Sequence, residues 1–145
     1  MFFGEYIHSL DAKGRIIIPS KFREELGERF YVTQGLDECL YIFSEEKWGS
    51  LLENLQKLPM ASKEARNISR RLIARAAQLE PDKMGRVLIP SVLRDAAGLD
   101  KDVSVVGAID KLEVWNKEKW ESAIDLDEER IDKCAEELIK AGIQF

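Results

Sequence analysis

The chain of 145 residues is 45% hydrophobic and 34% charged, which is typical of a folded globular protein and excludes a disordered one. No apolar run approaches the roughly 18 residues that span a membrane, and Glu5 without a basic residue before it argues against a secretory signal. Cys39 and Cys134 lie far apart with no second Cys or His at metal-ligand spacing. We therefore expect small core residues in a reducing cytoplasm, rather than a disulfide or a zinc site.

The net charge of −5 is concentrated at one end of the chain. Residues 121–145 contain eight acidic and three basic residues, so residues 1–120 sum to zero. A neutral body can carry a basic face, and the overall acidity therefore does not exclude a nucleic-acid partner.

The first predicted elements are two strands joined by a tight turn. Residues 6–10 alternate weakly between polar and apolar, and the isoleucines at 16–18 form a β-branched run expected to be buried on both faces. Asp11 and Gly14 are turn residues between them, which predicts a β-hairpin with Lys13 and Arg15 beside its tip. Pro19 ends the second strand, and we expect Ser20 to cap a short helix that ends before Gly27.

Two further strands and a longer helix follow. Residues 30–33 and 40–43 are rich in aromatic and β-branched side chains, with Gly35 in the turn region between them. Ser44 is the expected cap of a helix with Trp48, Leu51, Leu52, Leu55 and Leu58 at helical spacing.

The whole unit is then repeated. At an offset of 71 residues, seven positions are identical between 11–27 and 82–98: Asp11 and Asp82, Gly14 and Gly85, Arg15 and Arg86, Pro19 and Pro90, Ser20 and Ser91, Arg23 and Arg94, Gly27 and Gly98. At an offset of 72, Lys47-Trp48 matches Lys119-Trp120. The chain is therefore an internal duplication of a unit with the order strand, turn, strand, short helix, strand, strand, helix.

Two helices are predicted outside the repeated pattern. Residues 61–79 place alanine, isoleucine and leucine on one face, and five bases against one acid on the other. This helix is either a solvated connector or a basic docking face. Residues 127–141 predict an acidic helix whose apolar residues Ile131, Cys134, Leu138 and Ile139 pack on the body or on a neighbouring subunit.

Signals for catalysis are poor. His8 is the single histidine, and a lone histidine beside a strand usually has a structural role. Asp11 and Asp82 can be cast as an acid–base pair, but each occupies a turn position with a glycine three residues later, which favours a structural role. We therefore predict no enzyme activity, no catalytic residue, no cofactor and no metal site.

The two turns are better suited to binding DNA. A major groove admits a two-stranded β-ribbon, arginine pairs bidentately with guanine, and lysine contacts bases or phosphates. The candidate DNA-binding residues are Asp11, Lys13, Gly14 and Arg15 in the first copy, and Asp82, Lys83, Gly85 and Arg86 in the second. Each aspartate can hold the arginine four residues later in one rotamer. The alternative, that these arginines only pair with the aspartates, is equally compatible with the residues alone.

The paired Asp-x-x-Gly-Arg units, each running through an apolar strand into Pro and a short helix, resemble the MraZ family of bacterial transcriptional regulators, which is related to AbrB-like swapped-hairpin proteins. The likeness covers nearly the whole chain. It implies an α+β fold, an internally duplicated swapped-hairpin β-barrel with flanking helices, as one pseudo-twofold domain. The expected organisation is a first repeat unit over 1–60, a connecting basic helix over 61–80, a second unit over 81–121 and an acidic C-terminal helix over 122–145.

The resemblance also implies a cytoplasmic, nucleoid-associated regulator that binds double-stranded DNA. Proteins of this family are similar in binding promoter direct repeats upstream of their own division and cell-wall genes, commonly as repressors, and in forming ring-shaped homo-oligomers. The family's Asp-x-x-x-Arg motif falls on Asp11 and Arg15, and on Asp82 and Arg86. The alternative function is a protein–protein interaction module of the division machinery, for which an exposed patch around Trp48 and Trp120 would be the evidence.

Overall fold

The computed structural model describes residues 1–144, which form eight strands and six helices. The strands are β1 (Glu5–Ser9), β2 (Arg15–Ile17), β3 (Phe30–Gln34), β4 (Leu40–Ser44), β5 (Ala77–Leu79), β6 (Arg86–Leu88), β7 (Asp102–Gly107) and β8 (Leu112–Asn116). The helices are α1 (Ser20–Leu26), α2 (Glu45–Gln56), α3 (Lys63–Ile73), α4 (Ser91–Ala96), α5 (Lys117–Ile124) and α6 (Glu128–Lys140). The predicted α+β class is confirmed.

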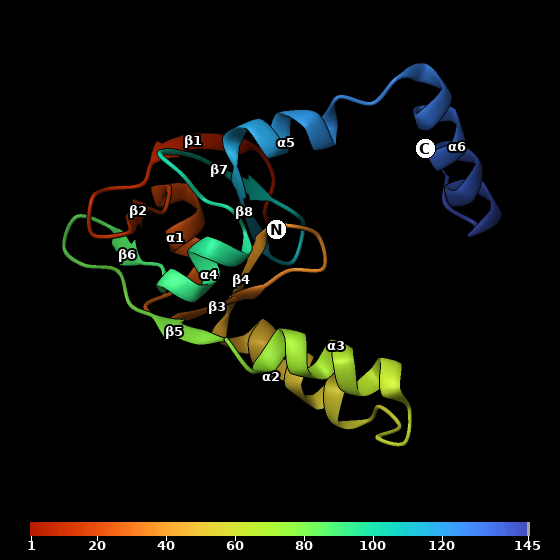
Figure 1. The fold of residues 1–145 in the computed structure, drawn as a ribbon, viewed down its shortest axis with the longest axis horizontal. Coiled ribbons are helices and arrows are strands. Elements are labelled where there is room, and N and C mark those ends of the chain that lie inside the picture. Colours follow the sequence, from red (N-terminus) through yellow and green to blue (C-terminus); the bar gives the residue numbers. More distant parts are fainter. Residues whose placement is uncertain (145) are drawn as a thin grey trace.

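The two copies exchange strands with each other (Figure 1). The first strand of copy one, β1, pairs antiparallel with β7 of copy two, and β5 of copy two pairs with β3 of copy one. The strands β4 and β8 join the copies at the centre of a six-stranded sheet with the order β1-β7-β8-β4-β3-β5. Each copy therefore supplies an edge strand that the other copy needs, so the duplicated halves form one structural unit.

The predicted local hairpin is wrong. Strand β2 pairs with its own counterpart β6 in a separate two-stranded sheet, while β1 lies in the six-stranded sheet. The turn after Asp11 therefore connects two sheets. The closed barrel is also not observed, because the sheet order of residues 1–144 ends at β1 and β5.

The apolar run in β2 is buried on one face only, which corrects the second expectation for this strand. Ile16 and Ile18 are buried in the core, but Ile17 is 39% exposed. The second copy behaves in the same way, since Leu88 is exposed between buried Val87 and Ile89. The β2–β6 ribbon covers the core with one face and presents the other to solvent. Three consecutive isoleucines in the sequence do not show this alternation between a buried and an exposed face.

The short helices α1 and α4 complete the core with Phe22 and Leu93, which are at most 1% exposed. The predicted Ser20 cap is wrong: Pro19 occupies the cap position of α1, Ser20 is the first helical residue, and no side chain caps the helix. Gly27, with φ +85°, ends α1 as predicted. Proline is suited to the start of a helix because its missing N–H has no intrahelical acceptor there.

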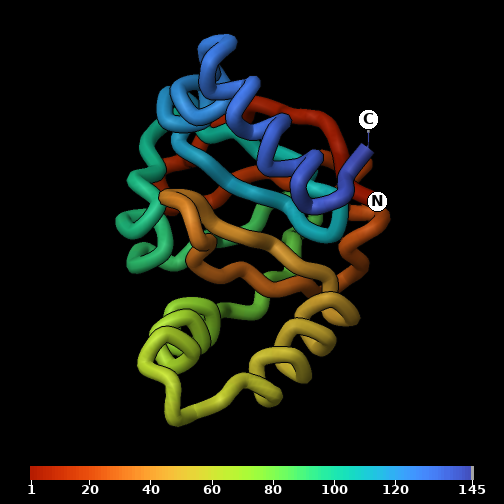
Figure 2. Tube along the Cα trace, turned by 90° about the vertical axis from the view of Figure 1, so that its right-hand side faces the viewer, coloured from red at the N-terminus to blue at the C-terminus, as the bar shows by residue number. Residues whose placement is uncertain are grey.

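Helices α2 and α3 form a helical hairpin on one side of the strands (Figures 1 and 2). The Ser44 side chain caps α2 by accepting from the Lys47 N–H at 3.3 Å, as predicted. The helix predicted over 61–79 ends at Ile73, and residues 77–79 form β5. The physical reason is the exchange of strands: β3 needs a partner on this edge, and residues 77–79 are the repeat of residues 6–8 in β1.

The acidic C-terminal helix α6 forms within the predicted bounds, with Asp127 as its cap. It projects away from the strands (Figure 1), and none of its residues is buried. Of the two expected packing sites for α6, the body of its own chain is therefore wrong, and packing on a neighbouring subunit stays a prediction. Cys134 on α6 is exposed, contrary to expectation, whereas Cys39 is buried in the body and burial raises the pKa of its thiol to about 12.

Candidate nucleic-acid interface

The first loop is built around the side chain of Asp11. Its Oδ1 accepts hydrogen bonds from the backbone N–H groups of Lys13 at 2.9 Å and Arg15 at 2.8 Å, and its Oδ2 accepts from Arg15 Nε at 2.7 Å. Gly14, with φ +84°, turns the chain back so that its N–H reaches the Asp11 carbonyl. One carboxylate thus holds both the loop backbone and the arginine side chain.

The second loop repeats this geometry. Asp82 accepts from the backbone N–H groups of Met84 and Arg86 at 2.9 Å each, and from Arg86 Nε at 2.8 Å. Gly85 has φ +80°. In each loop, the hydrogen bond from the arginine backbone N–H is the largest cause that lowers the pKa of the aspartate, followed by desolvation, which opposes it, and by the arginine side chain. Both aspartates are therefore ionised at neutral pH.

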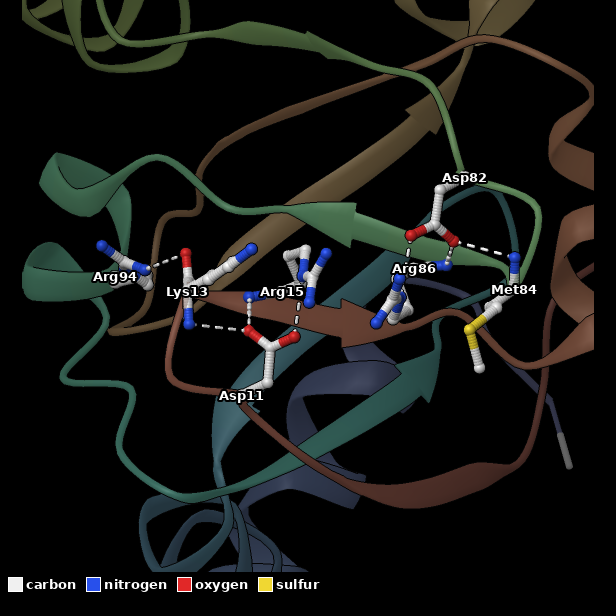
Figure 3. Close-up of polar contacts among 7 residues, drawn as sticks. All are labelled: Asp11, Lys13, Arg15, Asp82, Met84, Arg86 and Arg94. Carbon is white, nitrogen blue, oxygen red and sulfur yellow. Dashed lines mark hydrogen bonds and ion pairs between the residues drawn. The ribbon is translucent and has the colours of Figure 1, made fainter.

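The β2–β6 ribbon brings the two loops together. Arg15 lies opposite Leu88 and Ile17 lies opposite Arg86, so these four residues share one face. The central pair, Ile16 and Val87, points to the core. The exposed face therefore carries two arginines related by the pseudo-twofold axis (Figure 3). Each arginine lies opposite an exposed aliphatic residue of the other strand.

Each loop lies against an arginine from the short helix of the other copy. Arg94 on α4 reaches the first loop, where its Nη1 donates to the Lys13 carbonyl at 3.4 Å. Arg23 on α1 reaches the second loop, where a Cβ on Gly85 would lie 2.7 Å from the Arg23 Cζ. A Cβ on Gly14 would overlap the Arg94 guanidinium even more closely. Glycine is needed at both positions for this close approach as well as for its backbone angles.

Sequence analysis missed Arg23 and Arg94 as members of this surface. Their identity across the duplication was a usable signal, because it placed one extra base at the same point of each copy. Both arginines lie on short predicted helices, where a charged residue normally faces solvent without a specific role. Only the exchange between copies shows that each arginine lies against the loop of the other copy.

The resulting surface is suited to a polyanion. Within residues 1–144, Arg15 and Arg86 form ion pairs only through Nε, so the terminal nitrogens of both guanidinium groups have no protein partner. Those terminal nitrogens are the ones that bind a guanine edge or a phosphate bidentately. Lys13 and Lys83 are exposed in the two loops but occupy different positions, since Ala12-Lys13 in the first loop corresponds to Lys83-Met84 in the second.

The other predicted candidates do not join this surface. His8 lies on β1 with its Nε2 buried and without a hydrogen-bond partner, and desolvation lowers its pKa. Trp48 is buried and stacks on Tyr31, with ring centroids 5.4 Å apart. Trp120 is half-buried, and its Nε1 donates to Glu5 at 2.6 Å. No group of three or more metal-ligating side chains occurs within residues 1–144, and none of the helices there has the length and apolar character needed to cross a membrane.

Comparison with known proteins gives a consistent family assignment. The family described as "MraZ protein, putative antitoxin-like" matches twice, over residues 1–71 and 72–141. The chain is 50% identical over 145 residues to the transcriptional regulator MraZ of Lachnoclostridium phytofermentans, covering 100% of both chains. It is 50% identical over 143 residues to that of Acetivibrio thermocellus, covering 99% of this chain and 100% of the relative.

A more distant relative extends the pattern. The transcriptional regulator MraZ of Ligilactobacillus salivarius is 47% identical over 139 residues, covering 96% of this chain and 97% of the relative. The two family matches meet between residues 71 and 72, in the last turn of α3, so the second match contains β5 and the later strands of the second copy. The protein therefore belongs to the MraZ family.

Proposed function

We propose that this protein is a sequence-specific DNA-binding transcriptional regulator that reads double-stranded DNA with the exposed face of the β2–β6 ribbon. The observation that carries the proposal is the pair of arginines on that face, each held through Nε by its aspartate with the terminal nitrogens unpaired. A two-stranded ribbon fits a major groove, and a pre-positioned arginine loses little conformational entropy when it pairs with guanine.

The proposed DNA-binding residues are Asp11, Lys13, Gly14 and Arg15 with Asp82, Lys83, Gly85 and Arg86. The arginines make the base contacts, the aspartates position them, and the lysines contact phosphates. The glycines shape the loops so that nothing covers the arginine tips. Arg23 and Arg94 add positive charge behind each loop, and Arg94 also donates a hydrogen bond to the Lys13 carbonyl.

The proposed target is a set of direct repeats in the promoter of the protein's own division and cell-wall genes, where binding represses transcription in the nucleoid. A single arginine–guanine pair discriminates by only about 1–3 kcal/mol. Several copies in a homo-oligomeric ring would make later contacts intramolecular and raise avidity by roughly 10²–10⁴. In such a ring, each subunit would present one swapped-hairpin ribbon, and each ribbon would bind one of the repeated DNA sites.

The test is fluorescence anisotropy with duplex DNA from upstream of the gene, in several salt concentrations and with scrambled DNA as the control. Wild-type protein is expected to prefer the native duplex and to lose affinity with a log–log salt slope of about −0.9 per phosphate contact. Arg15→Ala and Arg86→Ala are each expected to reduce that preference. Arg29→Ala removes the same charge from an exposed site outside the ribbon and is the matched control.

Two results would overturn the proposal. The first is equal binding of native and scrambled DNA by the wild-type protein. The second is an unchanged preference in both Arg15→Ala and Arg86→Ala while Arg29→Ala behaves in the same way. Either result would assign the ion-paired arginines a structural role and return attention to a protein partner.

A further inference from the structure

Apart from the ribbon face, the helices of residues 1–144 carry at least two exposed apolar surfaces. One is the face of α6 formed by Ile131, Cys134, Ala135 and Leu138, which recur at helical spacing and of which Ile131 is 51% exposed. The other is a groove between α2 and α3 lined by Leu52, Leu55, Gln56, Met60, Ser69 and Ile73. Figure 1 shows α6 and the α2–α3 hairpin on different sides of the strands.

The charges beside these two surfaces are opposite in sign. Arg66 and Arg70 lie three residues before the groove residues Ser69 and Ile73, so they border the groove along α3. Lys63 continues this basic edge by one turn. On α6, Glu128, Asp132 and Glu136 follow each other at intervals of four residues and form one acidic edge of the apolar face.

Neither row of charges is neutralised within the chain. Over residues 1–144, no ion pair involves Lys63, Arg66 or Arg70, and none involves Glu128, Asp132 or Glu136. The other acids of α6 differ, because Glu129 pairs with Lys133 and Glu137 pairs with Lys140. The unpaired acids thus form the row on one side of the apolar face, Glu137 on the other side is paired, and the unpaired bases border the groove.

The remaining edges are also complementary. Arg130 lies on the side of α6 opposite to the acidic edge, and Glu53 lies on α2 beyond the groove residue Gln56. A helix laid in the groove with its acids along α3 would bring Arg130 towards Glu53. Only one of the two possible directions of the helix satisfies both pairs, which gives the contact a defined polarity.

We infer that α6 of one molecule docks in the α2–α3 groove of a second copy of this chain. Three residues, 125–127, connect α5 to α6, and at about 3.3–3.6 Å per residue they span roughly 10 Å. This short connection keeps α6 close to the end of α5. A head-to-tail contact of this type uses two different surfaces on each molecule, so it builds rings or filaments rather than closed pairs.

This inference depends on self-association, which the proposed function also uses, but it does not depend on DNA binding. The experiment therefore contains no DNA. The α6 variant Asp132→Lys/Glu136→Lys and the α3 variant Lys63→Glu/Arg70→Glu are compared with wild type by sedimentation velocity and native mass spectrometry. Glu24→Lys/Glu118→Lys, with the same charge change as the α6 variant on exposed residues outside α3 and α6, is the matched control.

Each docking variant alone is expected to weaken self-association by at least about tenfold, because like charges then face each other across the contact. The control variant keeps the wild-type mass. Mixing the two docking variants restores large assemblies, since the basic α6 of one meets the acidic α3 of the other. All of the substituted side chains are on helix surfaces, and circular dichroism verifies that every variant is folded.

Three results would overturn the inference. Wild-type mass in both docking variants would show that α6 and the groove do not meet. Monomers in the mixture would show that α6 does not bridge two molecules through these charges. A monomeric wild-type protein would remove the second copy as the occupant of the groove.

Discussion

The loops after Asp11 and Asp82 have the same skeleton and different tips. In both, one aspartate accepts two backbone N–H groups and the arginine Nε at distances between 2.7 and 2.9 Å. At the tip, however, Met84, 65% exposed, stands where the first loop has Lys13. The two copies therefore share the residues that position the arginine, and they differ at the exposed tip residue, which is Lys13 in one and Met84 in the other.

The largest expected effect tests whether the two skeletons are equivalent. Gly14→Ala and Gly85→Ala each force an L side chain into a positive-φ backbone and against an arginine. We expect each to reduce the free energy of unfolding by about 1–2 kcal/mol, measured by urea denaturation. Clearly unequal losses of unfolding free energy in the two variants would show that the two loops are not equivalent.

A glycine without these constraints provides the control. Gly49 lies inside α2, and a Cβ there would have nothing within 4 Å. Gly49→Ala is expected to raise the free energy of unfolding by about 0.5–1 kcal/mol, because alanine favours a helix more than glycine does. A loss of stability in Gly49→Ala would make the loop results uninterpretable as backbone effects.

The next effect separates the positioning of arginine from its charge. Asp11→Asn keeps an oxygen that can accept the backbone N–H groups, but it removes the carboxylate that holds Arg15 Nε. We expect the preference for native over scrambled DNA to fall by about tenfold, while total affinity changes less because an acid near the phosphates is removed. Anisotropy on both duplexes measures the two quantities, and Asp82→Asn tests the second loop in parallel. An unchanged preference would mean that the ion pair does not orient the arginine for reading bases.

A smaller effect is expected from exchanging the tips. Met84→Lys gives the second loop a base at the position that Lys13 occupies in the first, and Lys13→Met does the reverse. If both tips lie beside phosphates, the log–log salt slope should steepen by about 0.9 in Met84→Lys and become shallower by about 0.9 in Lys13→Met. A slope that responds at only one tip would show that the second loop does not reach DNA.

The smallest effect concerns pH. The folded-state pKa values of Asp11 and Asp82 are lowered from 3.8, mainly by the hydrogen bonds from the arginine backbone N–H groups. The stability that these aspartates contribute is therefore fully present above pH 3.8 and is lost as the pH falls through the lower folded-state values. Urea denaturation of wild type and of Asp11→Asn/Asp82→Asn should differ in pH dependence only in this acid range. A divergence that begins near neutral pH would contradict the assignment.

Local residue types were sufficient for several elements and insufficient for others. Ser44 caps its helix as predicted, because a cap depends on neighbours within one turn, and the helix predicted over 127–141 forms with Asp127 as its cap. The helix predicted over 61–79 is confirmed over Lys63–Ile73, but its predicted C-terminal end was wrong, because residues 77–79 form β5. At the repeat offset of 71, these residues correspond to residues 6–8 of β1. The local hairpin was wrong because neighbouring strands were assumed to pair, whereas β2 pairs with β6, 71 residues further along.

The sequence by itself determined the duplication, the α+β class, the aspartate-held loops and the family, because these depend on residue identity and short-range hydrogen bonds. Only the tertiary structure decided which strand pairs with which, since an apolar strand carries no label for its partner. That pairing also decided that Ile17 and Leu88 are exposed beside the arginines, and that Arg23 and Arg94 each lie against the loop of the other copy. The ribbon surface forms only when the two copies exchange strands, because its two strands, β2 and β6, come from different copies.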